Sequence, residues 1–324
     1  MEKVISPSCL QQINDLAFPV AYEFNEGTSV EDFAAFYSSN TKAIDEHLYR
    51  QGAISFNGLN IKSRTDFQTV VAAIGNRFIN YIDGNSPRTK LSDIVYTSTE
   101  YDPAQTITQH NELSYSANWP SRIFFCCIRA AATGGETPLA DGRKVLESMD
   151  KQIINAIESK GLTYIRNLHG GNGFGPSWQH TFETNDAAKV EEYCRNLSME
   201  FKWKEDGTLN LKHHRKGIIR HSVTGEKVWF NQVDQFHPTH LGRDVYEVLS
   251  AMYGADEELP TSVTFGDGTR IEDSMVQEII ETINTVIVAK PWAEGQLILV
   301  DNELVSHGRK PFTGEREVLV SMMK

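Results

Sequence analysis

A histidine and a carboxylate stand two residues apart in the run QTITQHNELSYSANWP, as His110 and Glu112. On a β-strand, side chains two residues apart project from the same face, so this pair could share one metal ion. Such a pair arises easily by chance in a chain with 10 histidines, and a metal site needs a third ligand. His307 supplies one, because it stands at the end of a predicted apolar strand and before a turn. Two histidines and one carboxylate form the facial triad that suits Fe(II).

Three protein ligands on one face of an octahedral metal leave three positions open, two for a chelating keto acid and one for dioxygen. The predicted cofactor is therefore Fe(II), with 2-oxoglutarate and dioxygen as cosubstrates. An arginine assisted by a hydroxyl would hold the distal carboxylate of 2-oxoglutarate. We expect Arg316, on the strand that follows the turn after His307, and Thr137, in the Gly-rich turn GGETPLAD, to bind it.

A β core is expected to position these residues. Apolar or alternating strand-like runs bounded by Gly, Asn or Asp include GAISFNGL, SRIFFCCIRA, GLTYIRNL, KVWFNQV, QLILVDN and EVLVSMM. Helical patterns, several with Ser, Thr or Asp in a capping position, cover 29–50, 64–82, 141–160, 186–197 and 271–289. The strands do not alternate regularly with helices as in a doubly wound sheet. The pattern predicts an α+β fold, a β sandwich or jelly roll with helical decoration, in a single domain over residues 1–324.

Longer fragments of the sequence resemble the taurine dioxygenase family of Fe(II)/2-oxoglutarate-dependent oxygenases. Within that family they are most similar to the amino acid hydroxylases of peptide natural-product pathways. The fragments, in the family's order, are GAISFNGLNI, YTSTEYDPAQTITQHNELSYSANWP, GGETPLADGRKV, SWQHTFET, KVWFNQVDQFHP and DNELVSHGRKPFTGEREVLV, covering roughly 50–324. The resemblance implies a cupin-like double-stranded β-helix. It also matches His110, Glu112 and His307 to iron ligands, and Thr137 and Arg316 to positions that bind 2-oxoglutarate.

The identity of residue 112 bears on the reaction. Related halogenases carry Gly or Ala at this position to admit chloride, so Glu112 disfavours chlorination. The sequence departs from the family pattern at Asn57, where relatives often have Arg, and at Gln296, where Asp commonly follows Gly. We expect Asn57 to be able to alter a contact with substrate or cosubstrate.

Other polar residues have both a binding and a structural interpretation. Candidate substrate contacts are Ser114, Tyr115, Asn231 and Arg309. For Tyr115 the alternative is core packing, whereas we expect Asn231 to line a pocket. For Arg309 the alternative is an ion pair with a surface acid. The KHHRK run with His213 and His214 is most simply a solvated turn, and the alternative is a mobile active-site lid. The HPTH run with His237 and His240 favours surface or capping roles over metal binding. GGNGFG lacks the spacing of a dinucleotide site and predicts a flexible loop.

The composition limits the partners. Asp and Glu total 43 against 31 for Lys and Arg, giving a net charge of -12, which repels nucleic acid and anionic membranes. We see no secretion signal at the N-terminus and no apolar run long enough to span a membrane, so we expect a cytoplasmic protein. The four cysteines lack CxxC spacing and are expected to be structural thiols.

The predicted function is hydroxylation of an unactivated C–H bond in a small amino-acid-like substrate. The sequence leaves open whether that substrate is free or tethered to a carrier protein, and whether the chain forms a homo-oligomer. A desaturase or cyclase on the same iron centre would lose two hydrogens instead of gaining oxygen. A non-catalytic sensor of iron or 2-oxoglutarate would form no succinate, and a zinc hydrolase would work without oxygen.

Overall fold

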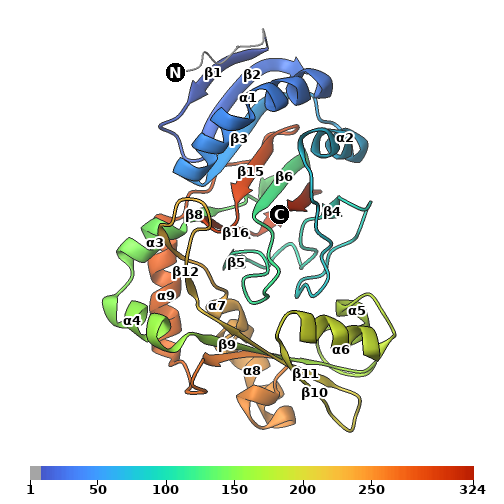
Figure 1. Cartoon of the computed structure of the whole chain (residues 1–324), viewed down its shortest axis with the longest axis vertical. Helices are drawn as coiled ribbons and strands as arrows, with labels where there is room; N and C mark the ends of the chain where they lie inside the picture. Colours follow the sequence, from blue (N-terminus) through green and yellow to red (C-terminus); the bar gives the residue numbers. More distant parts are fainter. Residues whose placement is uncertain (1–8) are drawn as a thin grey trace.

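A seven-stranded sheet forms one half of the core in the computed structural model, which describes residues 9–324 (Figure 1). The strand order is β1-β2-β3-β15-β6-β18-β4, with only β2 and β3 running parallel. The bounds are β1 Leu10–Asn14, β2 Val20–Thr28, β3 Ala53–Leu59, β4 Tyr96–Thr97, β6 Arg122–Arg129, β15 Leu297–Asp301 and β18 Glu317–Met323. The central strands β6, β15 and β18 are nearly continuous apolar runs because both of their faces are buried.

Two N-terminal helices cover the outer face of this sheet. Helix α1 (Val30–Gln51) begins at Ser29, whose side chain accepts a hydrogen bond from the backbone N–H of Asp32. Helix α2 (Arg64–Ile74) begins in the same way at Ser63. Helix α1 packs on β2, β3 and β15, and α2 packs on β6 and β18, in one buried cluster that includes Phe33 and Phe67. Figure 1 shows α1 lying along β2 and β3.

A three-stranded sheet, β5-β16-β8, forms the second half of the core. It consists of β5 Ile107–His110, β16 Val305–Arg309 and β8 Leu139–Asp141, all antiparallel. Strands β15 and β16 follow each other along the chain, so they connect the larger sheet to the smaller one. The prediction of a jelly-roll β core with helical decoration is confirmed.

The remaining segments pack on the side of the smaller sheet. A third sheet has the order β10-β11-β9-β14, with β9 Leu162–Leu168, β10 Glu200–Trp203, β11 Leu209–Arg215 and β14 Thr261–Phe265. The helices are α3 Gly142–Ser148, α4 Lys151–Lys160, α5 Trp178–Thr181, α6 Ala187–Asn196, α7 Val233–Phe236, α8 Arg243–Tyr253 and α9 Asp273–Val286. Short elements are β7 Thr133–Gly134 with β17 Phe312–Thr313, β12 Ile218–Arg220 with β13 Lys227–Trp229, and the 3-10 helices η1 Pro238–Leu241 and η2 Asp256–Glu258.

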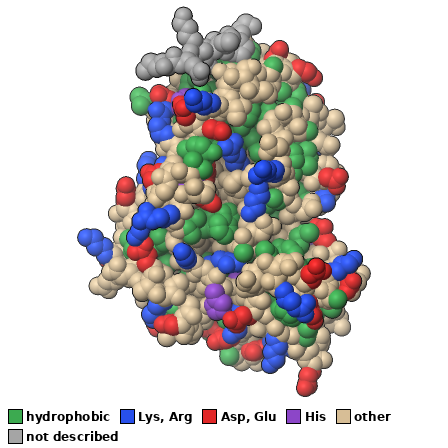
Figure 2. Space-filling model, in the orientation of Figure 1, with side chains coloured by type: hydrophobic (Ala, Val, Ile, Leu, Met, Phe, Trp, Pro, Cys, Tyr) green, Lys and Arg blue, Asp and Glu red, His purple; other side chains and the backbone are tan. Residues whose placement is uncertain are grey.

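One hydrophobic cluster joins the central sheets to this outer part, since it contains Val300 and Val305 together with Tyr164 and Val263. A shared core is what we expect of the single domain that the sequence predicts. On the face in Figure 2, acidic and basic side chains are interspersed. Among the described residues no helix is both long and apolar enough to cross a membrane. The residues on which the absence of a secretion signal was predicted lie partly outside the described range.

The five predicted helical regions are all helical, with two differences. Helix α2 ends at Ile74 rather than near residue 82, because Gly75 takes an extended conformation there. The region 141–160 is two helices, since Asp150 leaves the helical conformation and caps α4 by accepting a hydrogen bond from the N–H of Gln152.

Candidate active site and metal centre

The three predicted metal ligands meet at the smaller sheet. His110 ends β5 and is the direct cross-strand partner of His307 on β16. Their ring centres are 4.4 Å apart, and Nε2 of His307 lies 3.6 Å from Oε2 of Glu112. The ligand atoms of all three side chains lie within 4.8 Å of one another, and all three residues are buried.

Glu112 lies just beyond the end of β5 rather than on the strand. Its position is fixed by Asn302, whose Oδ1 accepts from the Glu112 N–H at 2.7 Å and whose Nδ2 donates to the Glu112 carbonyl at 3.0 Å. Leu113 follows with a φ of 56°, which turns the chain away. A turn held by a side chain, and not the alternation of a strand, therefore aims this carboxylate at the histidines.

The polar atoms of the cluster fit a divalent metal ion. Both ring nitrogens of His307 are buried without a hydrogen-bond partner. Nδ1 of His110 lies 2.9 Å from the Thr108 carbonyl oxygen, so a proton on Nδ1 leaves Nε2 free to bind metal. Burial, with His307 beside it, lowers the pKa of His110 to about 3, which keeps this ring neutral. Two neutral imidazoles and a carboxylate, with no thiolate, suit Fe(II).

The carboxylate of Glu112 has a cationic neighbour that the sequence did not indicate. Nη2 of Arg88 lies 2.5 Å from Oε2 of Glu112, and both side chains are almost fully buried. Burial would raise the pKa of Glu112, but Arg88 and the two histidines outweigh it and hold the pKa below its ordinary value. Glu112 is therefore ionised and ready to bind a cation.

The two predicted 2-oxoglutarate residues line the same narrow cavity as His110 and His307. Nε of Arg316 donates to the Gly135 carbonyl at 2.9 Å, and Nη1 donates to Oγ of Ser98 at 3.2 Å. Burial, together with the neighbouring Arg309, lowers the pKa of Arg316 to about 10, so it stays cationic at neutral pH. Oγ1 of Thr137 accepts from the indole N–H of Trp292 at 3.2 Å.

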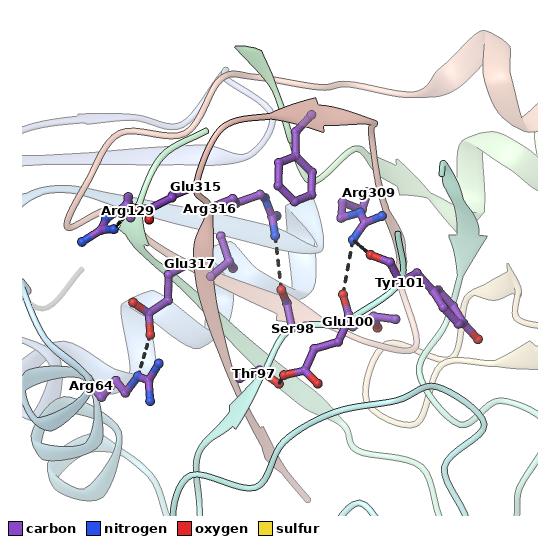
Figure 3. A pocket seen from close by; sticks show the side chains of 13 residues that line it. Arg64, Thr97, Ser98, Glu100, Tyr101, Arg129, Arg309, Glu315, Arg316 and Glu317 are labelled. Carbon is purple, nitrogen blue, oxygen red and sulfur yellow. Dashed lines mark hydrogen bonds and ion pairs between the residues drawn. The ribbon is translucent and has the colours of Figure 1, made fainter. Parts of the chain in front are cut away.

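A wider cavity of about 500 Å³ opens on the other side of Arg316 (Figure 3). Arg309 and Arg316 face it from one side, and the segment Thr97–Tyr101 faces it from the other. Arg64 and Arg129 also line it, but each is paired with an acid, Glu317 and Glu315 respectively. Arg316 therefore stands between the outer cavity and the metal ligands.

Arg309 lines both cavities, but the two terminal nitrogens of its guanidinium are occupied by the backbone, and Nε is buried without a hydrogen-bond partner. It donates to the carbonyl oxygens of Thr99, Tyr101, Asp102 and Gln105. The surface ion pair considered from the sequence is absent from the described residues. Through these hydrogen bonds Arg309 instead fixes the 99–105 segment beside the cavity.

The other three candidate substrate residues do not line either cavity. The hydroxyl of Tyr115 donates to the Asp83 carbonyl at 2.7 Å, and its ring packs on Tyr164 and Phe236. Nδ2 of Asn231 donates to the Gly217 carbonyl at 2.9 Å. Ser114 is buried, and its hydroxyl has no hydrogen-bond partner. Their role in binding substrate remains a prediction that these contacts do not support.

The structure corrects the interpretation of His213 and shows which of its two predicted roles His237 takes. The polar residues around His213 predicted a solvated turn. In the structure His213 is instead a buried residue of β11, 1% exposed. His237 is buried rather than at the surface, and it takes the predicted capping role by accepting from the N–H of Thr239 at the start of η1. All four cysteines are free thiols, as expected.

Comparison with known proteins decides the family. Residues 12–323 match the model of the taurine catabolism dioxygenase TauD, TfdA family. The chain belongs to this family. It is therefore a dioxygenase, and membership confirms the predicted dependence on Fe(II) and 2-oxoglutarate, to which the buried His110, Glu112 and His307 cluster offers a fitting donor set.

Two curated relatives span most of the chain. The dapdiamide synthesis protein DdaC of Enterobacter agglomerans is 37% identical over 296 residues, which cover 91% of this chain and 88% of DdaC. A clavaminate synthase-like protein of Arabidopsis thaliana is 32% identical over 292 residues, covering 87% of this chain and 84% of that protein.

Solved structures share the fold at low sequence identity. PvcB from Pseudomonas aeruginosa superposes with a TM-score of 0.53 at 11% identity, over 94% of this chain and 85% of PvcB. An asparagine oxygenase, solved with Fe(II), 3-hydroxyasparagine and succinate, superposes with a TM-score of 0.53 at 13% identity, over 91% of this chain and 83% of that one.

Proposed function

We propose that this dioxygenase hydroxylates an unactivated C–H bond of an amino acid or amino-acid-derived substrate in natural-product biosynthesis. His110, Glu112 and His307 would hold the iron, and Arg316 and Thr137 would hold 2-oxoglutarate. The observation that carries the proposal is that the ligand atoms of His110, Glu112 and His307 lie within 4.8 Å of one another. The two histidines also line one cavity together with Thr137 and Arg316.

The class of substrate is supported by the relatives. DdaC is named for the synthesis of dapdiamide, and the asparagine oxygenase structure contains a hydroxylated amino acid beside succinate. When iron, 2-oxoglutarate and dioxygen are bound, they supply an oxidant strong enough for an unactivated carbon. The overall reaction consumes R–H, dioxygen and 2-oxoglutarate and yields R–OH, succinate and carbon dioxide.

The chain's own residues would position the reactants and exclude water. Phe125 packs on the His307 ring with 4.9 Å between ring centres, and thereby provides an apolar wall beside the ligand. Arg309 holds the 99–105 segment against the cavity through four backbone contacts. A dry, rigid site favours reaction of the substrate over loss of the oxidant to solvent.

Product analysis tests the proposal. The Fe(II)-loaded protein would be incubated with 2-oxoglutarate, dioxygen and each of the twenty L-amino acids, with succinate and product mass as readouts. We expect succinate together with a product that has gained one oxygen. Loss of two hydrogens would indicate desaturation or ring formation, and turnover without oxygen would indicate a hydrolase. Absence of succinate with free amino acids and with carrier-bound aminoacyl groups would contradict the proposal.

A further inference from the structure

Arg88 interacts with Glu112 and with the Tyr81 side chain, yet two of its buried donors have no partner at hydrogen-bonding geometry. Its side chain is 2% exposed, and only Nη2 is paired, with Oε2 of Glu112. Nε and Nη1 are buried without a hydrogen-bond partner. The guanidinium carbon also lies 4.7 Å from the centre of the Tyr81 ring. Buried donors left without acceptors destabilise a protein, and a guanidinium fork is suited to a carboxylate that can accept from two of its nitrogens.

The unused donors belong to a residue of the cavity wall. Arg88 lines the narrow cavity together with His110, His307, Thr137 and Arg316. Under the proposed function, the distal carboxylate of 2-oxoglutarate is held by Arg316 and its keto-acid end by the metal. Both anionic ends of the cosubstrate are thus accounted for. The acceptor for Arg88 is then expected to come from a different molecule in the same cavity.

The segment that carries Arg88 is held firmly, although it lies outside the core sheets, between α2 and β4. Asp83, five positions earlier, forms a fully buried ion pair with Arg166 of β9. The Asp83 carbonyl also accepts from the Tyr115 hydroxyl, and the Tyr81 N–H donates to the Tyr96 hydroxyl at 3.2 Å. A cation fixed in advance loses little conformational freedom when a ligand binds.

A metal ion on Glu112 would change the partner of Arg88. Oε2 of Glu112 is paired with Arg88 and is also the oxygen 3.6 Å from Nε2 of His307, so an ion held by Glu112 and His307 would compete with Arg88 for this carboxylate. Neutralisation of that carboxylate by a divalent ion weakens its attraction for the guanidinium. Loading the metal would therefore make more of Arg88 available to a second anion next to the metal.

We propose that Arg88 binds a free carboxylate of the primary substrate. This inference rests on the proposed function. It narrows the class of substrate to compounds that carry a free carboxylate near the reacting carbon. A free amino acid, or a conjugate that keeps one carboxylate, meets this requirement. An amino acid joined through its only carboxyl group to a carrier protein as a thioester does not.

The test uses the visible charge-transfer band of the anaerobic complex with Fe(II) and 2-oxoglutarate, and the change in that band when substrate binds. The probes are each of the twenty L-amino acids and its C-terminal amide, which differ at the carboxylate alone. We expect at least one acid to perturb the band of the wild type at a concentration tenfold or more below its amide. In Arg88→Met the acid should bind at least tenfold more weakly, while affinities for the amide and for 2-oxoglutarate change less than twofold.

Two further variants separate a binding role from a structural one. Arg88→Lys keeps the charge but loses the fork, and should retain part of the preference for the acid. Lys90→Met removes a more exposed cation from the same segment and should leave every affinity unchanged.

Three results would overturn the inference. These are equal binding of acid and amide to the wild type, no response to any acid, or an equal loss of 2-oxoglutarate and acid affinity in Arg88→Met. The first two need only the wild type, so they hold even if Arg88→Met does not fold. Absence of the band from the wild type would instead contradict the proposed function itself.

Discussion

The side-chain amide of Gln296 donates a 2.8 Å hydrogen bond to Oδ1 of Asn57, across the paired strands β15 and β3. Asn57 and Gln296 are the two positions at which a departure from the family pattern was expected from the resemblance. Asn57 in turn donates to Oε1 of Glu23 at 2.8 Å. Neither residue lines either cavity, so the expected influence of Asn57 on a substrate or cosubstrate contact has no support in the structure. The two side chains instead form an amide–amide pair next to the larger sheet.

The substitutions Asn57→Arg and Gln296→Asp should be coupled in their effects on the free energy of unfolding. Gln296→Asp alone places a second carboxylate near Glu23 and should lower the free energy of unfolding by about 1 kcal/mol. Adding Asn57→Arg should recover that loss. Urea unfolding of the wild type, the two single variants and the double variant measures the coupling, and strictly additive effects would contradict it. Binding of Fe(II) and 2-oxoglutarate should not change in any of the four proteins.

The buried pair of Asp83 and Arg166 is expected to be the strongest electrostatic contact outside the metal site. Both side chains are fully buried. Arg166→Met should lower the free energy of unfolding by roughly 3–5 kcal/mol, because it leaves a buried charge uncompensated. Adding Asp83→Asn should recover part of this loss.

The control for this pair is Arg195→Met, which breaks an exposed pair with Glu191 on α6 and should cost less than about 1 kcal/mol. Urea unfolding provides the measurement. Equal costs for Arg166→Met and Arg195→Met would show that burial of the Asp83 pair does not matter to stability.

His213 should make the protein less stable in mild acid. Burial, together with Arg166 and Arg215, lowers the pKa of His213 well below its ordinary value. Below about pH 6.5 the unfolded chain therefore takes up a proton that the folded chain does not, and the stability present above that pH is lost as the pH falls. From pH 7 to pH 5 this one group should cost about 2 kcal/mol.

A matched pair of variants isolates that contribution. His213→Gln keeps a polar side chain that cannot titrate, and it should remove this part of the difference in unfolding free energy between pH 7 and pH 5. His214→Gln changes the half-exposed neighbour and should leave the difference as in the wild type. If the free energy of unfolding of the two variants depends on pH in the same way, His213 is not the cause of the lower stability in mild acid.

The sequence predicted those parts of the site that belong to the core strands. His110 and His307 could be placed because both lie on strands of the β core, and Arg316 because it enters the next strand after a short turn. Glu112 was found through its spacing of two from His110, although it lies beyond the end of β5 and not on the strand that the spacing assumed, and Thr137 was proposed from its Gly-rich turn. Burial of His213 also had a signal in the sequence, since Leu209, Leu211 and His213 alternate along β11 toward the interior, but the neighbouring charges obscured it.

Arg88 had no such signal. It lies in an irregular, polar segment whose path depends on the distant contact between Asp83 and Arg166, and local sequence does not encode that contact. The two hydrogen bonds between Asn302 and the Glu112 backbone direct the Glu112 carboxylate toward the histidines. They depend in the same way on a loop far along the chain. Tertiary contacts of single side chains, rather than periodicity, decide both positions.

The proposed function requires that His307 holds iron and that Arg316 holds 2-oxoglutarate at one cavity. Anaerobic optical titration with Fe(II) and 2-oxoglutarate tests it most directly, with His307→Ala, Arg316→Ala and the exposed control Arg195→Ala beside the wild type. We predict a weak visible charge-transfer band in the wild type and the control, no band in His307→Ala, and at least tenfold weaker binding of 2-oxoglutarate in Arg316→Ala. A wild type without the band, or a His307→Ala variant that keeps it, would contradict the account.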